Sequence, residues 1–65
     1  MSSNNYIRIS KEGKLFVVYD KDSDTGKGII IGKSESFKMA REIARDYSML
    51  NIVEYGVHID EDCFE

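Results

Sequence analysis

Residues 37–50 carry the strongest periodic pattern in the sequence. Apolar residues recur there at spacings of three and four, and most charged residues occupy the positions between them. This spacing is typical of a helix with one apolar face. Its apolar positions are Phe37, Ala40, Ile43, Ala44, Tyr47 and Leu50. Ser34 or Ser36 can cap the helix, because a serine hydroxyl accepts a hydrogen bond from the free N–H groups of a first turn.

The other apolar residues fall into four short segments that favour β-strands. Residues 6–10 and 52–59 alternate apolar and polar side chains, which is the pattern of a strand with one buried face. Residues 15–19 and 29–31 are continuously apolar and rich in β-branched and aromatic side chains. Gly13 lies between the first two segments, where it can adopt the positive φ of a tight hairpin turn.

The order of these segments predicts an α+β fold, a small two-layer β-β-β-α-β domain. We expect a mainly antiparallel sheet with one helix packed on one face. Because a strand, a helix and a second strand form a crossover unit, the last strand should run parallel to the third and to the first. We expect a disordered N-terminus at residues 1–5, a single domain at 6–59 and an acidic C-terminal tail at 60–65.

The composition is that of a small intracellular protein. The chain has 65 residues, a net charge of −3 and one cysteine, so it can form no internal disulfide. The start of the sequence shows no charged segment followed by an apolar one, which a secretory leader would need. No apolar run approaches the roughly 20 residues of a membrane helix. We therefore expect a cytoplasmic protein that does not span a membrane.

The second strand carries more apolar residues than one helix can cover. A helix covers one face of a sheet, so the strands beneath it should alternate apolar and polar side chains. If the odd-numbered residues of segment 15–19 face the helix, Phe16 and Val18 face away from it, and Ile30 of the third strand joins them. We predict that these three residues bind a protein partner, with a homodimer as the simplest arrangement. The alternative is that a twisted sheet or the ends of the chain cover the patch.

Five basic residues support a second hypothesis, a nucleic-acid-binding module that uses a basic helix face. They are Lys27, Lys33, Lys38, Arg41 and Arg45. Such residues are candidates for contact with phosphates. Glu42 and Asp46 interrupt the basic stripe on the helix and can neutralise it by pairing with its bases. Residues 51–65 carry five acids and no Lys or Arg, and this acidic balance argues against nucleic acid as the partner.

Two short motifs resemble ligand-binding loops but depart from them at essential positions. Asp20, Asp22 and Asp24 alternate as in a calcium loop, but the glycine and the bidentate glutamate of that loop are missing. Residues 28–34 end in Gly-Lys-Ser before a helix, as a phosphate-binding loop does, but the spacing is one residue short. We keep the three aspartates as a weak cation candidate and predict no metal or other cofactor.

No arrangement of catalytic side chains can be recognised. His58 is the only histidine and Cys63 the only cysteine in the sequence. A lone histidine on the polar side of a strand is more often a surface residue than a base. The acids around Cys63 disfavour its thiolate, so we expect no reactive nucleophile, and a disulfide between two chains is the practical risk. We predict that the chain is not an enzyme.

The order of the elements, with Gly-Lys-Ser before a helix that carries Ala40 and Ala44, resembles small β-β-β-α-β modules such as the HicB-type antitoxins. A similar order occurs in the arm-binding domains of phage integrases. Both resemblances concern topology over residues 6–59 and carry no site residue to this chain. We interpret the chain as a non-catalytic protein-interaction module, a regulator or inhibitor of a larger protein.

Overall fold

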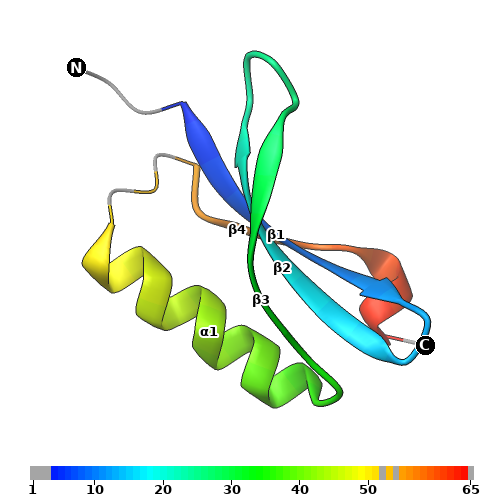
Figure 1. Ribbon diagram of the computed structural model, residues 1–65. Coiled ribbons are helices and arrows are strands. Elements are labelled where there is room, and N and C mark those ends of the chain that lie inside the picture. Colours follow the sequence, from blue (N-terminus) through cyan, green and yellow to red (C-terminus); the bar gives the residue numbers. More distant parts are fainter. Residues whose placement is uncertain (1–3, 52, 54, 65) are drawn as a thin grey trace.

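The computed structural model of the protein describes residues 4–51, 53 and 55–64 and shows a four-stranded sheet with one helix across one face (Figure 1). Along the chain, the elements are β1 (Asn5–Glu12), β2 (Leu15–Asp22), β3 (Gly28–Ser34), α1 (Phe37–Leu50), β4 (Val57–Ile59) and the 3₁₀ helix η1 (Glu61–Phe64). This architecture confirms the predicted two-layer α+β fold.

The strands lie in the order β3-β2-β1-β4, so β3 and β4 are the two edges of the sheet. β2 pairs antiparallel with both β1 and β3, whereas β4 pairs parallel with β1. The last strand therefore runs in the direction of the first and the third, as predicted. A two-residue turn joins β1 to β2, and its first residue, Gly13, has φ +64°. Glycine adopts this angle without steric cost, and it therefore allows a hairpin turn of only two residues.

The core lies between the sheet and α1. Ile7 and Ile9 of β1 and Val18 of β2 are fully buried. Ala40 and Ala44 of α1 are buried against them, and their small side chains let the helix approach the sheet. Larger side chains pack around this centre, namely Phe16, Ile31, Phe37, Ile43, Tyr47 and Val53. Because burial of one large aliphatic side chain contributes about 1.5–3 kcal/mol, this cluster supplies much of the driving force for folding.

Serine capping of the helix is confirmed at Ser36. Its Oγ accepts a hydrogen bond from the backbone N–H of Met39 at 3.4 Å. At the other end, the backbone N–H of Asn51 donates to the carbonyl oxygen of Tyr47 at 2.9 Å and closes the helix. Leu50, predicted on the apolar face, is 85% exposed, because α1 diverges from β3 toward its C-terminal end (Figure 1).

The bounds of all four strands differ from the predictions; β1 continues to Glu12, and β3 covers Gly28–Ser34 instead of the predicted 29–31. β1 begins at Asn5, one residue before the predicted domain, and residues 1–3 of the predicted disordered N-terminus lie outside the described residues. β2 continues through the polar residues 20–22, because they still pair with β1. Of the predicted strand 52–59, residues 52 and 54 lie outside the described residues, and β4 covers Val57–Ile59, directly after Gly56 with its φ of +76°.

The predicted acidic tail contains a packed segment. Residues 61–64 form η1, and Cys63 within it is 7% exposed and belongs to the core. The Cys63 thiol donates to the carbonyl oxygen of Ile9, with Sγ 3.5 Å from that oxygen. The rings of Phe64 and Phe37 meet with centroids 5.7 Å apart. The thiol is therefore poorly accessible for the disulfide between chains that was considered a risk from the sequence.

Candidate functional site

Two of the three residues predicted to bind a partner face α1 instead of solvent. Val18 is fully buried, and the centroid of the Phe16 ring lies 5.5 Å from that of Phe37. The predicted orientation of β2 is therefore wrong. The two-residue turn pairs Val18 with Ile9, and the alternation of β1 places Ile9 on the helix side of the sheet. Ile30 is 55% exposed and remains available for binding.

The sheet face opposite α1 is covered by the chain's own polar and aromatic side chains. Val17 points to this face, yet it is only 4% exposed. Arg8 and Asp60 form a salt bridge on this face, with Nη2 2.8 Å from Oδ2. The Tyr6 and His58 rings meet edge to face, with centroids 5.0 Å apart. These neighbours leave less apolar surface on this face than the sequence predicted.

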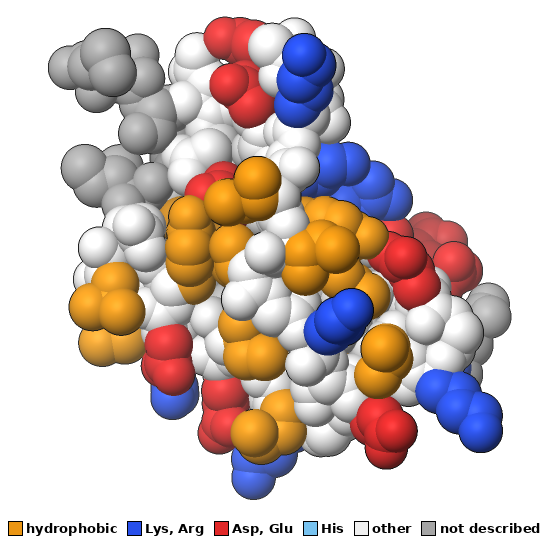
Figure 2. All heavy atoms as spheres, in the orientation of Figure 1, with side chains coloured by type: hydrophobic (Ala, Val, Ile, Leu, Met, Phe, Trp, Pro, Cys, Tyr) orange, Lys and Arg blue, Asp and Glu red, His pale blue; other side chains and the backbone are white. Residues whose placement is uncertain are grey.

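β3 exposes large aliphatic side chains at an edge of the sheet where no further strand of the described residues pairs with it. Ile29 and Ile30 are 63% and 55% exposed, and they point to opposite faces. Ile31 is the extra residue of a β-bulge and packs against the core. Figure 2 shows hydrophobic side chains gathered over β3 and α1. We call Ile29, Ile30 and the outer backbone of β3 the β3 edge surface; Ile29 was not among the predicted site residues.

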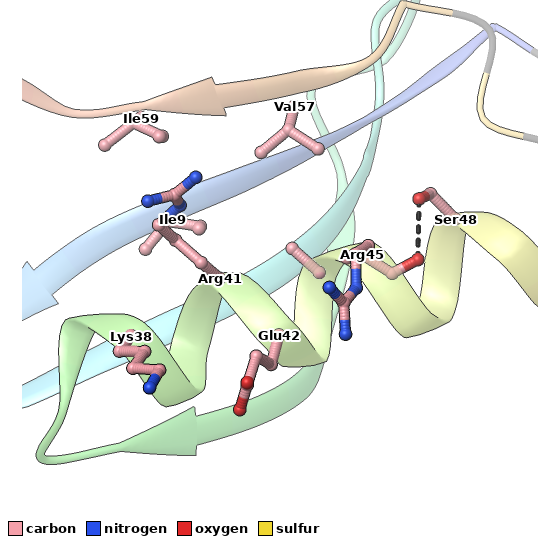
Figure 3. Close-up of a pocket in the computed structure, with 9 residues that line it drawn as sticks. Ile9, Lys38, Arg41, Glu42, Arg45, Ser48, Val57 and Ile59 are labelled. Carbon is pink, nitrogen blue, oxygen red and sulfur yellow. Dashed lines mark hydrogen bonds between the residues drawn. The ribbon is translucent and has the colours of Figure 1, made fainter.

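A groove with a volume of about 470 Å³ lies between α1 and β4, at the other edge of the sheet (Figure 3). Ile9, Val57 and Ile59 form its apolar sheet side. Val57 and Ile59 are 43% and 36% exposed, although their register with β1 places them on the face that carries α1. We call this site the α1–β4 groove. Its apolar half was not predicted from the sequence.

The structure brings together three of the five predicted basic residues. Lys38, Arg41 and Arg45 line the helix side of the α1–β4 groove (Figure 3). Lys33 lies on the opposite face of the sheet, as its register with β2 shows, and Lys27 precedes β3 at the end of a turn. The predicted five-residue basic surface is therefore divided between separate parts of the molecule.

The positive charge of the groove is only partly neutralised. The Nε of Arg45 lies 3.7 Å from Oδ1 of Asp46, and both side chains are 68% exposed, so this ion pair is weak. Glu42 also lines the groove. Among the described residues, no ion pair joins Glu42 to Lys38, although their spacing on the helix allows one.

The three aspartates considered as cation ligands bind separate partners. Asp20 accepts a hydrogen bond from the Tyr47 hydroxyl. Asp22 accepts from the backbone N–H groups of its own turn, and Asp24 accepts from the side-chain amide of Asn4 at 2.7 Å. Within the part of the chain that the structure describes, no three His, Cys, Asp or Glu side chains converge as metal ligands. The alternation in sequence therefore does not bring the three carboxylates together as one group.

His58 lies on the sheet face away from α1. Its Nε2 is 3.1 Å from the carbonyl oxygen of Tyr55, and its ring contacts Tyr6. The nearby Arg8 and Asp60 side chains are engaged with each other. In this environment the imidazole packs and hydrogen-bonds locally, with no nucleophile among the described residues in hydrogen-bond contact with it.

Comparison of this chain with known protein families, curated proteins and solved structures found no match. In the part of the chain that the structure describes, none of the helices combines the length and the hydropathy of a membrane span. Function is therefore inferred from the geometry of the β3 edge surface and the α1–β4 groove.

Proposed function

We propose that this chain is a non-catalytic protein-interaction module that dimerises through the β3 edge surface. The observation that carries this proposal is the exposure of Ile29 and Ile30, 63% and 55%, on a strand whose outer edge is unpaired among the described residues. An exposed apolar strand edge is a template for pairing with another strand. A module of this kind acts by binding and catalyses no reaction, so it is suited to regulate or inhibit a larger protein.

Charge distribution favours a second copy of the chain as the occupant of this edge. Residues 22–27, beside the start of β3, hold two acids and one lysine. Residues 11–14 and 33–38, beside its end, together hold four lysines and two acids. Antiparallel pairing of two β3 strands about a twofold axis places the acidic end of each copy against the basic end of the other. The sheet then continues from one copy into the next.

The expected affinity is modest. Full burial of an isoleucine contributes about 1.5–3 kcal/mol, and each of these side chains is already partly buried. Association itself costs about 4–15 kcal/mol in lost freedom of motion, which the backbone hydrogen bonds of a new strand pair must help to offset. We therefore expect a dimer with a micromolar dissociation constant, which a concentration series can detect.

Sedimentation velocity over about 5–500 µM, a range that brackets micromolar affinity, tests this proposal. The wild-type chain should pass from monomer to dimer, and Ile30→Glu should stay monomeric, because the twofold pairing would bury its carboxylate. Tyr55→Glu is the matched control, since Tyr55 is 54% exposed near the other edge of the sheet. This variant should dimerise like the wild type. A wild-type chain that stays monomeric throughout, or an Ile30→Glu variant that dimerises normally, would contradict the proposal.

Nucleic-acid binding is the second candidate function, and the alignment of Lys38, Arg41 and Arg45 along one side of α1 favours it. Three phosphate contacts with a single strand predict a steep loss of affinity with salt, about 20-fold between 50 and 200 mM. A fluorescein-labelled single-stranded DNA, titrated at these two salt concentrations, measures this loss. Affinity that is absent at low salt, or insensitive to salt, would exclude this function.

A further inference from the structure

We propose that the α1–β4 groove binds an extended segment of a partner protein, apolar in its centre and acidic at its flanks, as an additional strand beside β4. This groove lies at the opposite edge of the sheet from the β3 edge surface. It does not depend on dimerisation, and a monomeric chain would still bind the segment.

The groove exists because α1 does not cover the whole sheet. The main contacts of α1 are with β3, β2 and β1. Val57 and Ile59 of β4 point to the helix side but remain 43% and 36% exposed, beside the buried Ile9. Apolar side chains of a bound segment would remove these residues from water, a gain of about 25 cal/mol for each Å² of apolar surface buried.

The backbone of β4 offers unpaired hydrogen-bonding groups at the same edge. The N–H of Ile7 donates to the Gly56 carbonyl oxygen at 2.9 Å, and the N–H of Asp60 donates to the Ile9 carbonyl oxygen at 3.0 Å. Backbone groups alternate in direction along a strand, so those of Val57 point away from β1. No strand of the described residues lies on that side. An added strand would use these groups, as in other complexes formed by strand addition.

The positive charge of the groove favours acidic side chains at the flanks of the bound segment. Lys38, Arg41 and Arg45 line it, opposed by one acid, Glu42, whereas the whole chain has a net charge of −3. Guanidinium groups bind carboxylates through paired hydrogen bonds, which gives acidic side chains a directional partner. The groove is thus a basic site on an acidic protein, and carboxylates are its complementary ligands.

The length of the groove indicates a short peptide. Its helix side runs from Lys38 to Ser48, which corresponds to about 15 Å at a rise of 1.5 Å per residue. An extended chain rises about 3.3 Å per residue, so four or five residues would span this distance. Phosphates would meet the basic side chains, but a nucleic acid has no aliphatic side chains for the apolar side and no regular series of amide N–H and C=O groups to pair with the β4 backbone. These two features favour a peptide.

A library of random peptides of about nine residues, displayed on phage, tests the proposal on the full chain; this length covers the groove with flanks. Arg41→Glu/Arg45→Glu serves for counter-selection, because both side chains are exposed and their exchange should leave the fold unchanged in circular dichroism. Enriched peptides should combine Val, Ile or Leu with Asp or Glu. A fluorescently labelled copy of an enriched peptide should bind the double variant at least about tenfold more weakly than the wild type, as measured by fluorescence polarisation.

Two further measurements separate strand addition at this groove from other modes of binding. Ile30→Glu, at the opposite edge, should bind the peptide like the wild type, which keeps this test independent of dimerisation. In strand addition, every second residue of the peptide directs its backbone N–H to β4. N-methylation of those residues should abolish binding, whereas N-methylation of the intervening residues should leave it unchanged. The proposal is overturned if no acidic and apolar peptide is enriched, if the double variant binds equally well, or if single-stranded DNA binds the groove more tightly than every peptide.

Discussion

Arg8 and Asp60 form a bidentate ion pair on the sheet face away from α1. The guanidinium Nε donates to Oδ1 at 2.9 Å, and Nη2 donates to Oδ2 at 2.8 Å. The same Asp60 donates its backbone N–H to the carbonyl oxygen of Ile9. Two types of contact therefore hold the segment between β4 and η1 against β1. The hydrogen bonds from Arg8 hold the pKa of the Asp60 carboxyl below its usual range, against the opposing effect of partial burial.

Asp60→Asn should lower the free energy of unfolding by about 1 kcal/mol at pH 7, because the two side chains are 40% and 26% exposed and water screens part of their attraction. A carboxyl whose pKa is lowered by folding stabilises the protein above its unfolded pKa of about 3.9. This contribution disappears as the pH falls through the lower folded pKa. Urea unfolding of wild type and variant should therefore converge at acid pH. A constant difference between pH 7 and pH 3 would contradict this account.

Gly32→Ala should destabilise the protein by about 1–3 kcal/mol, the usual cost of overpacking a core. A Cβ at position 32 would lie 2.8 Å from Cγ2 of Ile43, which is too close for a stable contact. The side chain of Ile43 is branched at Cβ and cannot easily turn away. Ile43→Ala removes the obstacle, so the double variant should lose less stability than the two single changes summed. Thermal unfolding of the four proteins measures this coupling, and strict additivity would exclude the clash.

Cys63 should react at least about tenfold more slowly with a thiol reagent in the native protein than in urea, since thiolate content and access control its reactivity. Burial raises the pKa of its thiol, and the negative charges of Asp60 and Asp62 raise it further. Both the low thiolate fraction and the packing against Ile9 protect the sulfur. Absorbance of the released thiolate of Ellman's reagent at pH 8 gives the two rates. Equal rates would show that η1 does not stay packed on the core.

The type and order of the elements could be predicted because each is determined by local pattern. The 3.6-residue period of 37–50, the apolar run 15–19 and the turn at Gly13 each indicate one structure. The wrong prediction of which face of β2 is buried could also have been avoided. A two-residue turn sets Ile9 opposite Val18, and the alternation of β1 already indicated that Ile9 is buried. The continuous apolar run 15–19 concealed the pairing of Ile9 with Val18, because both faces of that strand carry apolar side chains typical of a core.

The α1–β4 groove could be predicted only in part. The basic stripe on the helix was visible from its spacing, as Lys38, Arg41 and Arg45 recur every three or four residues. Its apolar side depends on the strand order and on where α1 crosses the sheet, which no local pattern contains. Val57 and Ile59 read as buried residues of a long strand. The strand order places them in β4 at an edge of the sheet, directly after Gly56 with its positive φ.

The parallel pairing of β4 with β1 joins Ile7 to Val57, fifty residues further along the chain. The two hairpins β1–β2 and β2–β3 connect near neighbours in sequence and can form before that long loop closes. Three residues of β4, preceded by a glycine, are thus the part of the sheet held by the fewest local constraints. Their amide protons should exchange with solvent ahead of the central strands, and occupation of the groove should slow that exchange most at this edge.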